Sequence, residues 1–131
     1  MNNTALHYAC QIADEAITSQ LLSKGANVHA RSSFGSTPLH FACLSGSLEI
    51  CRTLIAHGAD ADIHVIDDDG TPFDVASQEC FTSVMRLLSE HGADVNRKDS
   101  QGMNALFYAA KKGCIDTLRE ALALGVDPCM R

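Results

Sequence analysis

Apolar residues recur along the chain in pairs of short helical runs, separated by polar stretches that contain glycine. In the unit that begins at Thr37, the residues Leu39, Ala42 and Cys43 fall on one face of a helix, and the run 48–55 repeats the pattern. A Gly-Ser pair between the two runs breaks the helix, and a further glycine ends the second one. The pattern therefore predicts two short amphipathic helices, followed by roughly a dozen residues that form a turn or hairpin.

The same unit occurs four times at a nearly constant spacing. Steps of 33, 34 and 33 residues separate Gly25, Gly58, Gly92 and Gly125. A threonine, or Asn104 in the last unit, stands 21 residues before each glycine, so the extra residue falls in the connection between the second and third units. Helix pairs this short cannot bury their apolar faces alone, so neighbouring pairs must stack into an all-α solenoid. The predicted repeats of this single domain, 1–131, are approximately 1–30, 31–63, 64–97 and 98–131.

The motifs inside the units resemble those of the ankyrin repeat family. The second unit, GSTPLHFACLSGSLEICRTLIAHGADAD, carries T-P-L-H, a pair of small residues, G-x-x-E-I and an ending similar to G-A-D-V-N. The third unit is a looser copy, and the first and fourth are recognisable outer ones. The resemblance covers residues 4–128. It implies an ankyrin-repeat solenoid of helix-turn-helix pairs joined by β-hairpin-like loops.

Two His-x-x-C pairs raise the question of a metal or thiol site. His40 and Cys43 lie three residues apart on one helix face, as do His7 and Cys10 in the first unit. The third unit has an aspartate and a serine at these places and adds no new ligands, so a zinc site is disfavoured. The resemblance implies instead that the histidines bond backbone and threonine groups between repeats, while the cysteines fill small core positions.

The six cysteines are predicted to be free thiols rather than a disulfide framework, because the N-terminus has no secretory pattern. Adjacent helices lie roughly 8–10 Å apart, which is too far for a Cys10–Cys43 bond. Cys80 is unusual, since it and Phe81 replace the glycine and small polar residue that separate the helices elsewhere. A buried filler thiol is the favoured interpretation, and a strained, more exposed turn is the alternative.

Charge and motifs narrow the function classes. A net charge of −6 argues against nucleic acid as the main partner, and no apolar run approaches the ~20 residues of a membrane span. The acidic run Asp67–Asp69 is not a calcium loop, because Val65 and Ala76 would occupy the first and last ligand positions. No catalytic motif is present, so we expect no enzyme activity, no metal and no cofactor. Acids concentrate in 61–96 and bases in 97–112, a gradient that would orient a partner with a basic feature opposite the third repeat.

In ankyrin arrays the hairpin tips and the ends of the first helices line a concave groove. The resemblance therefore implies a non-catalytic protein-binding or scaffold module, which we expect to be a cytoplasmic monomer, with the nucleus as the alternative location. Phe34, Leu44 and Met103 are apolar at positions where packing sets no demand, which suggests contact with a partner; the alternative for Phe34 is that its ring folds back onto the hairpin. The candidates for binding a partner protein or peptide are Arg31, Ser33, Phe34, Ser36, Leu44, Ser45, Asp67, Asp68, Asp69, Gln78, Glu79, Gln101, Met103, Lys111 and Lys112.

Three further points stay open on the sequence alone. The chain could be a targeting or regulatory array of a larger protein with an enzymatic domain, or a spacer without a ligand. The last helical run carries Leu118, Leu122 and Leu124 where a terminal repeat is normally polar, which predicts a slice of a longer array or a covered end. Asn96 resembles the ankyrin asparagine that hydroxylases modify, although a hairpin-stabilising amide is the favoured interpretation.

Overall fold

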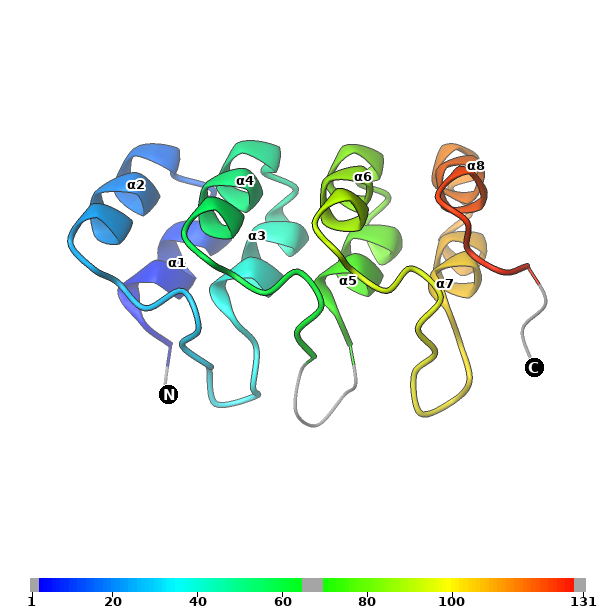
Figure 1. The fold of residues 1–131 in the computed structure, drawn as a ribbon, viewed down its shortest axis with the longest axis horizontal. Coiled ribbons are helices and arrows are strands. Elements are labelled where there is room, and N and C mark those ends of the chain that lie inside the picture. The colour runs from blue at the N-terminus through cyan, green and yellow to red at the C-terminus, as the bar shows by residue number, and fades with distance from the viewer. Residues whose placement is uncertain (1–2, 65–69, 129–131) are drawn as a thin grey trace.

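The computed structural model describes residues 3–64 and 70–128, and within these segments the chain forms eight α-helices and no strand. Consecutive helices pair, and the four pairs stack side by side (Figure 1). The first helices of the pairs form one row, the second helices form another, and the loops 24–37 and 91–104 project beyond the row of first helices. This arrangement confirms the predicted all-α solenoid. The helices are α1 (Ala5–Gln11), α2 (Glu15–Ser23), α3 (Pro38–Ser45), α4 (Leu48–Ala56), α5 (Pro72–Gln78), α6 (Thr82–Glu90), α7 (Ala105–Lys112) and α8 (Ile115–Ala123).

The histidines of the His-x-x-C pairs join consecutive repeats. The backbone N–H of Thr4 donates to His7 Nδ1 at 3.0 Å, so the ring proton lies on Nε2, which is 3.0 Å from the carbonyl oxygen of Ser36. His40 repeats the arrangement with the N–H of Thr37 at 3.1 Å and the Gly70 carbonyl at 3.3 Å. Both ring nitrogens are thus engaged, which leaves neither free for a metal. The structural interpretation of these pairs is confirmed.

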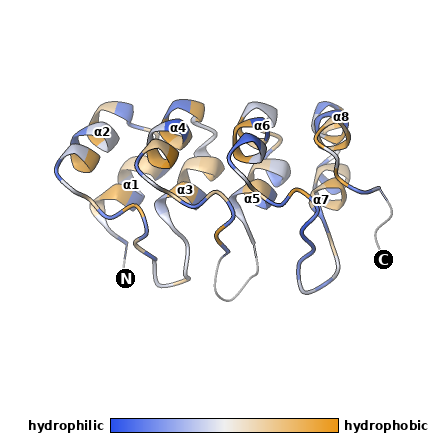
Figure 2. Ribbon diagram, in the orientation of Figure 1, coloured by the Kyte–Doolittle hydropathy of each residue, from blue (hydrophilic) through white to orange (hydrophobic). Residues whose placement is uncertain are grey.

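The core lies between the two rows of helices and between neighbouring repeats. Leu6, Leu39 and Phe73, which are equivalent in the first three repeats, are each buried. Figure 2 shows hydrophobic residues concentrated in the helices and a largely hydrophilic loop between α6 and α7. The outer helices α6 and α8 are also linked by Arg86, whose Nε and Nη2 each donate to a carboxylate oxygen of Glu120 at 2.9 Å.

The free-thiol prediction is wrong for two cysteines. Cys80 and Cys114 form a disulfide, with Cα atoms 6.1 Å apart, and both residues are half-buried. The favoured interpretation of Cys80 as a buried filler is therefore also wrong. Equivalent positions on adjacent helices lie too far apart for a disulfide, but this bond joins non-equivalent positions, the α5–α6 turn and the first residue before α8. Cys10, Cys43 and Cys51 are free and buried, so the predicted absence of a Cys10–Cys43 bond is confirmed.

Candidate functional site

A row of partly exposed side chains runs along the first helices. Tyr8, Phe41, Val75 and Tyr108 occupy equivalent positions in the four repeats, and all four are at least partly exposed to solvent. One helical turn further on, the equivalent positions hold Gln11, Leu44, Gln78 and Lys111. We call the surface formed by these two rows the groove face. The row that begins at Tyr8 is aromatic or apolar throughout, and the row that begins at Gln11 ends in the charged Lys111.

The N-terminal half of the groove face contains a cavity of about 360 Å³, which we call the aromatic cavity. Phe34 is 76% exposed and Tyr8 is 45% exposed, while the Phe41 ring packs edge-on against His7 with ring centroids 5.2 Å apart. The Phe34 ring therefore does not fold back onto the hairpin. The cavity is lined by Asn3, Tyr8, Gln11, Ser32, Ser33, Phe34, Ser36 and Phe41.

Hydrogen bonds fix the hairpin tip that carries Phe34. Ser32 donates its backbone N–H to the carbonyl of Ser36 at 2.8 Å, and its hydroxyl oxygen accepts from the N–H of Ser36 at 3.1 Å. The Arg31 guanidinium donates to the carbonyls of Gly35 at 2.8 Å and His64 at 2.7 Å, which ties this tip to the next connection. The exposed ring is thus held on an ordered support.

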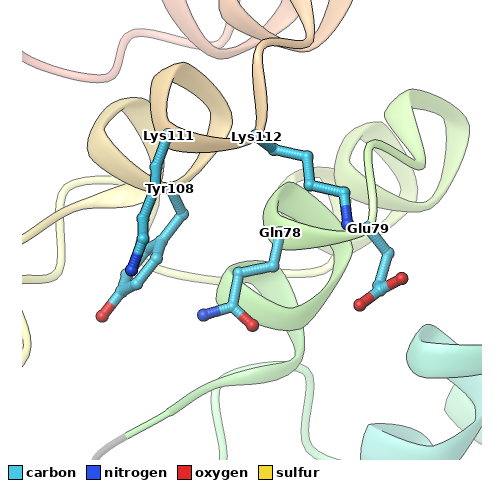
Figure 3. A pocket seen from close by; sticks show the side chains of 5 residues that line it. All are labelled: Gln78, Glu79, Tyr108, Lys111 and Lys112. Atoms are coloured by element: carbon cyan, nitrogen blue, oxygen red, sulfur yellow. The ribbon is translucent and has the colours of Figure 1, made fainter.

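The C-terminal half of the groove face contains a second cavity of about 310 Å³, which we call the charged cavity. Figure 3 shows its lining, with Gln78 and Glu79 at the end of α5 and Tyr108, Lys111 and Lys112 on α7. The Tyr108 hydroxyl donates to the carboxylate of Asp99, which also accepts from the N–H of Met103 at 2.9 Å. Because Tyr8 and Tyr108 are equivalent residues, the two cavities open on the same side of the first helices.

The remaining predicted residues lie around these cavities or outside the described segments. Leu44 is 50% exposed between the two cavities, and Ser45 donates its hydroxyl to the Ala42 carbonyl at 2.9 Å. Gln101 is exposed and Met103 is half-buried in the connection between α6 and α7, and neither residue lines these cavities. Asp67, Asp68 and Asp69 lie outside the described residues.

Tyr8, Phe41 and Tyr108 were not among the residues predicted from the sequence. The signal that would have found them is the repeat register itself, because each stands four residues after the capping residue of its unit, at a position that stays at least partly exposed. Aromatic side chains at such a partly exposed position mark a surface, even though Phe41 also packs against the core, and the predicted candidates lay only at the hairpin tips and helix ends.

Asn96 bridges two connections. Its side-chain oxygen accepts from the N–H of Asp127 at 2.6 Å, and its amide donates to the carbonyl of Gly125 at 3.1 Å. This geometry supports the hairpin-stabilising role of the amide. Its hydroxylation stays a prediction.

The buried thiols are poorly suited to nucleophilic chemistry. Burial raises the pKa of Cys10 to about 12, and it also raises the pKa of Cys43. A thiol of such a pKa is protonated near neutral pH, and the thiolate is the nucleophilic form. Among residues 3–64 and 70–128, no group of three or more His, Cys, Asp or Glu side chains is arranged to hold a metal. The helices of these segments are also too short to span a bilayer.

The family model described as ankyrin repeats (three copies) matches residues 1–67 and 60–131. The chain belongs to the ankyrin repeat family. Ankyrin repeats are in general protein–protein interaction modules and are typically not catalytic. The matching model describes three copies, and the described part of this ankyrin chain holds four helix pairs.

The relatives of this ankyrin chain are longer proteins, and the chain matches one part of each. It is 34% identical over 122 residues to a transient receptor potential cation channel subfamily A member 1 homolog of Caenorhabditis elegans, covering 93% of this chain and 10% of that protein. It is 30% identical over 128 residues to the B-cell lymphoma 3 protein homolog of Mus musculus, covering 95% and 29%. A probable 26S proteasome regulatory subunit p28 of Saccharomyces cerevisiae is 32% identical over 124 residues, covering 92% and 54%. The chain therefore spans from a tenth to about half of the length of these relatives.

Proposed function

We propose that this ankyrin array binds a partner protein or peptide along its groove face and performs no chemistry of its own. The observation that carries the proposal is the aromatic cavity, where Phe34 is 76% exposed on a hydrogen-bonded tip. An exposed aromatic ring contributes nothing to the core and reduces solubility, so it is expected where a partner covers it. Large aromatic side chains supply much of the binding energy of interfaces, and a rigid support lowers the entropic cost of association.

The two halves of the groove face favour a partner with two kinds of group. An apolar or aromatic side chain fits the aromatic cavity, and an acidic group suits the charged cavity, where Lys111 and Lys112 outnumber Glu79. Charge pairs at the rim of an interface act mainly on orientation and association rate. The difference between the aromatic cavity and the charged cavity would thus set the direction in which the partner lies along the groove face. Monomeric state and cytoplasmic or nuclear location belong to the same proposal.

The test compares matched variants of the intact chain. Wild type, Tyr8→Ala/Phe34→Ala and Arg52→Ala are immobilised, and retained proteins from lysate of the source cells are quantified. Arg52 is an exposed residue of the outer helix α4, and its ion pair with Glu49 is of the kind that contributes little. We expect the aromatic double variant to reduce retention of the partner by roughly tenfold or more, and Arg52→Ala to leave it unchanged.

Circular dichroism keeps the test interpretable. Phe34 lies on the surface, so Phe34→Ala alone should leave the melting temperature nearly unchanged. Retention of the same partner by the folded double variant, together with its loss after changes on the outer helices, would place the contact on the other face and overturn the proposal.

A second proposal follows from the share of the relatives that the chain covers, which is 10%, 29% and 54%. The array would then serve a larger protein as a targeting or regulatory segment, and an enzymatic domain elsewhere in that protein would make the groove face a recruitment site. The full reading frame of the gene distinguishes this role from that of an independent scaffold.

A further inference from the structure

Cys80 and Cys114 occupy positions where cysteine is locally a poor choice. Cys80 has φ +65°, in the left-handed region, where the equivalent residues are Gly46 and Gly113 in the second and fourth repeats and Ala13, with φ +59°, in the first. Any side chain there carries a steric cost that glycine avoids. Cys114 is the N-cap of α8 and, like Phe81 before α6, makes no side-chain capping bond, whereas Asp14 and Ser47 cap α2 and α4 at the equivalent positions.

These two residues meet in space and form a bond. Their Cα atoms are 6.1 Å apart across the interface of the third and fourth repeats, 34 residues apart in sequence. At the preceding interface the corresponding contact joins Gly46 and Phe81, where a Cβ added to the glycine would lie 2.6 Å from the ring. The diagonal contact therefore occurs at both of these interfaces, and only at the last one is it a covalent bond. Departures from local preference that coincide at one contact indicate a functional requirement.

We propose that Cys80 and Cys114 form a site of reversible thiol oxidation that takes low-molecular-weight disulfides of the glutathione class and controls the charged end of the groove face. Both residues are half-buried, so solvent reaches them, in contrast to the buried Cys10, Cys43 and Cys51. Reversible exchange at accessible paired cysteines is typical of redox-responsive proteins.

The reaction proceeds by two exchange steps. The thiolate of one cysteine attacks a sulfur of the small disulfide, forms a mixed disulfide and expels one small thiolate. The thiolate of the second cysteine attacks the protein sulfur of that mixed disulfide, which forms the Cys80–Cys114 bond and expels the second small thiolate. The protein loses two thiol protons and two electrons, the small disulfide gains both electrons, and two small thiols result. Excess small thiol reverses both steps.

The bond lies directly beside the charged cavity. Glu79 immediately precedes Cys80, and Lys112 stands two residues before Cys114. Gln78 and Lys111 are the next residues inward on the same two helices. The bond therefore fixes the ends of α5 and α7 relative to one another, and reduction releases that constraint while the helices stay packed. The consequence for partner binding rests on the proposed function, but the exchange chemistry does not.

The first experiment tests the site without any partner. The intact chain is equilibrated in buffers of varied reduced and oxidised glutathione, its free thiols are alkylated, and its peptides are mapped by mass spectrometry. We expect a Cys80–Cys114 link that appears and disappears reversibly, with Cys10, Cys43 and Cys51 alkylated after denaturation at every ratio. Complete alkylation of Cys80 and Cys114 in the oxidising buffers, or a link that excess glutathione and dithiothreitol leave intact, would overturn the proposal.

The second experiment tests control of the groove face by amide hydrogen exchange. Reduction should speed exchange of residues 78–82 and 111–116 by roughly tenfold, and leave the equivalent turns 11–15 and 44–48 unchanged. Cys80→Gly and Cys114→Ser should show the reduced behaviour in both buffers. Both variants restore residues that other repeats use at these positions, so they are expected to fold.

A matched control keeps the outcome specific. Cys10→Ala replaces a buried thiol with the residue found at the equivalent Ala110, and it should respond to glutathione like wild type. Equal exchange in the oxidised and reduced wild type would overturn the control of the groove face. Failure of the aromatic variants described above would overturn partner binding there but leave these two results standing, so the two failures are distinguishable.

Discussion

At the scale of single residues, one position of the repeat holds two ionisable side chains, in different repeats, whose pKa values are shifted in opposite directions. His40 and the equivalent Asp74 both bond to the backbone N–H of the threonine that starts their helix. Burial lowers the pKa of His40 from 6.5 to about 4 and raises the pKa of Asp74 from 3.8 to about 6. Burial therefore favours the neutral form of each side chain over its charged form.

The pH dependence of stability should expose this opposition. The unfolded chain protonates His40 below about 6.5 and the folded chain only near 4, so this group removes stability as the pH falls through that window, by up to about 3 kcal/mol. Asp74 acts in the opposite sense, because the folded chain takes up its proton near pH 6, before the unfolded chain does near 3.8. The two contributions should largely cancel between pH 6 and 4.

The variant Asp74→Asn removes only the second contribution. We expect it to be more stable than wild type by about 1–2 kcal/mol at pH 7, because no buried carboxylate has to be charged. Its advantage should shrink as the pH falls from 6 to 4. Urea unfolding at pH 7, 6, 5 and 4.5 measures the difference between the two chains, in which all shared titrations cancel. A constant difference across this range would show that the Asp74 pKa is not raised.

At the scale of the element, the turn between the two helices of a repeat combines a backbone requirement with a contact to the next repeat. Gly46 and Gly113 have φ of +78° and +84°, and both end their helices in the left-handed conformation. Only at Gly46 does a neighbour crowd the site where a side chain would start. The same conformation is therefore required at both positions, but for one of them the adjacent repeat adds a second constraint.

The substitutions Gly46→Ala and Gly113→Ala should separate these two constraints. Gly113→Ala carries only the cost of the left-handed conformation, about 1–2 kcal/mol. Gly46→Ala places its Cβ 2.6 Å from the Phe81 ring and should cost about 1–3 kcal/mol more. In a Phe81→Ser background this excess should vanish, which a double-mutant cycle on urea unfolding measures. Equal costs for the two alanines in the wild-type background would contradict the steric contact.

At the scale of the whole molecule, the stack is quasi-one-dimensional, since the main contacts of each helix pair, among the described residues, are with the neighbouring pairs. Leu6 in the first repeat and Leu39 in the second are equivalent and equally buried. They differ in that the repeat of Leu39 has a described neighbour on each side. This difference makes them a matched pair for testing how stability spreads along the array.

Truncation of either leucine to alanine should cost about 2–5 kcal/mol locally. Leu39→Ala weakens a repeat that joins two interfaces, so we expect one cooperative transition at a lower urea concentration. Leu6→Ala weakens a repeat with a described neighbour on one side only, so this repeat should lose hydrogen-exchange protection at urea concentrations where the other three remain folded. Identical shifts of a single transition for both variants would show that the four repeats unfold as one unit.

The sequence by itself determined the repeat and most of its local structure. The spacing of glycines, the threonine caps before His40 and Asp74 and the apolar periodicity are local signals, and the structure places the helices where they predict. These signals could also show that Phe34 stands where the core makes no demand. The tertiary structure decided what depends on contacts between non-equivalent positions. In the repeat register Cys80 is equivalent to Gly113, but in the structure Cys80 is bonded to Cys114. The reason is that the turn between the helices of the third repeat lies diagonally beside the N-cap of α8 in the fourth. The tertiary structure likewise brings Tyr8 and Phe41 together with Phe34, which stands on the hairpin tip, in one cavity. Periodicity states which residues are alike, and only packing decides which unlike residues touch.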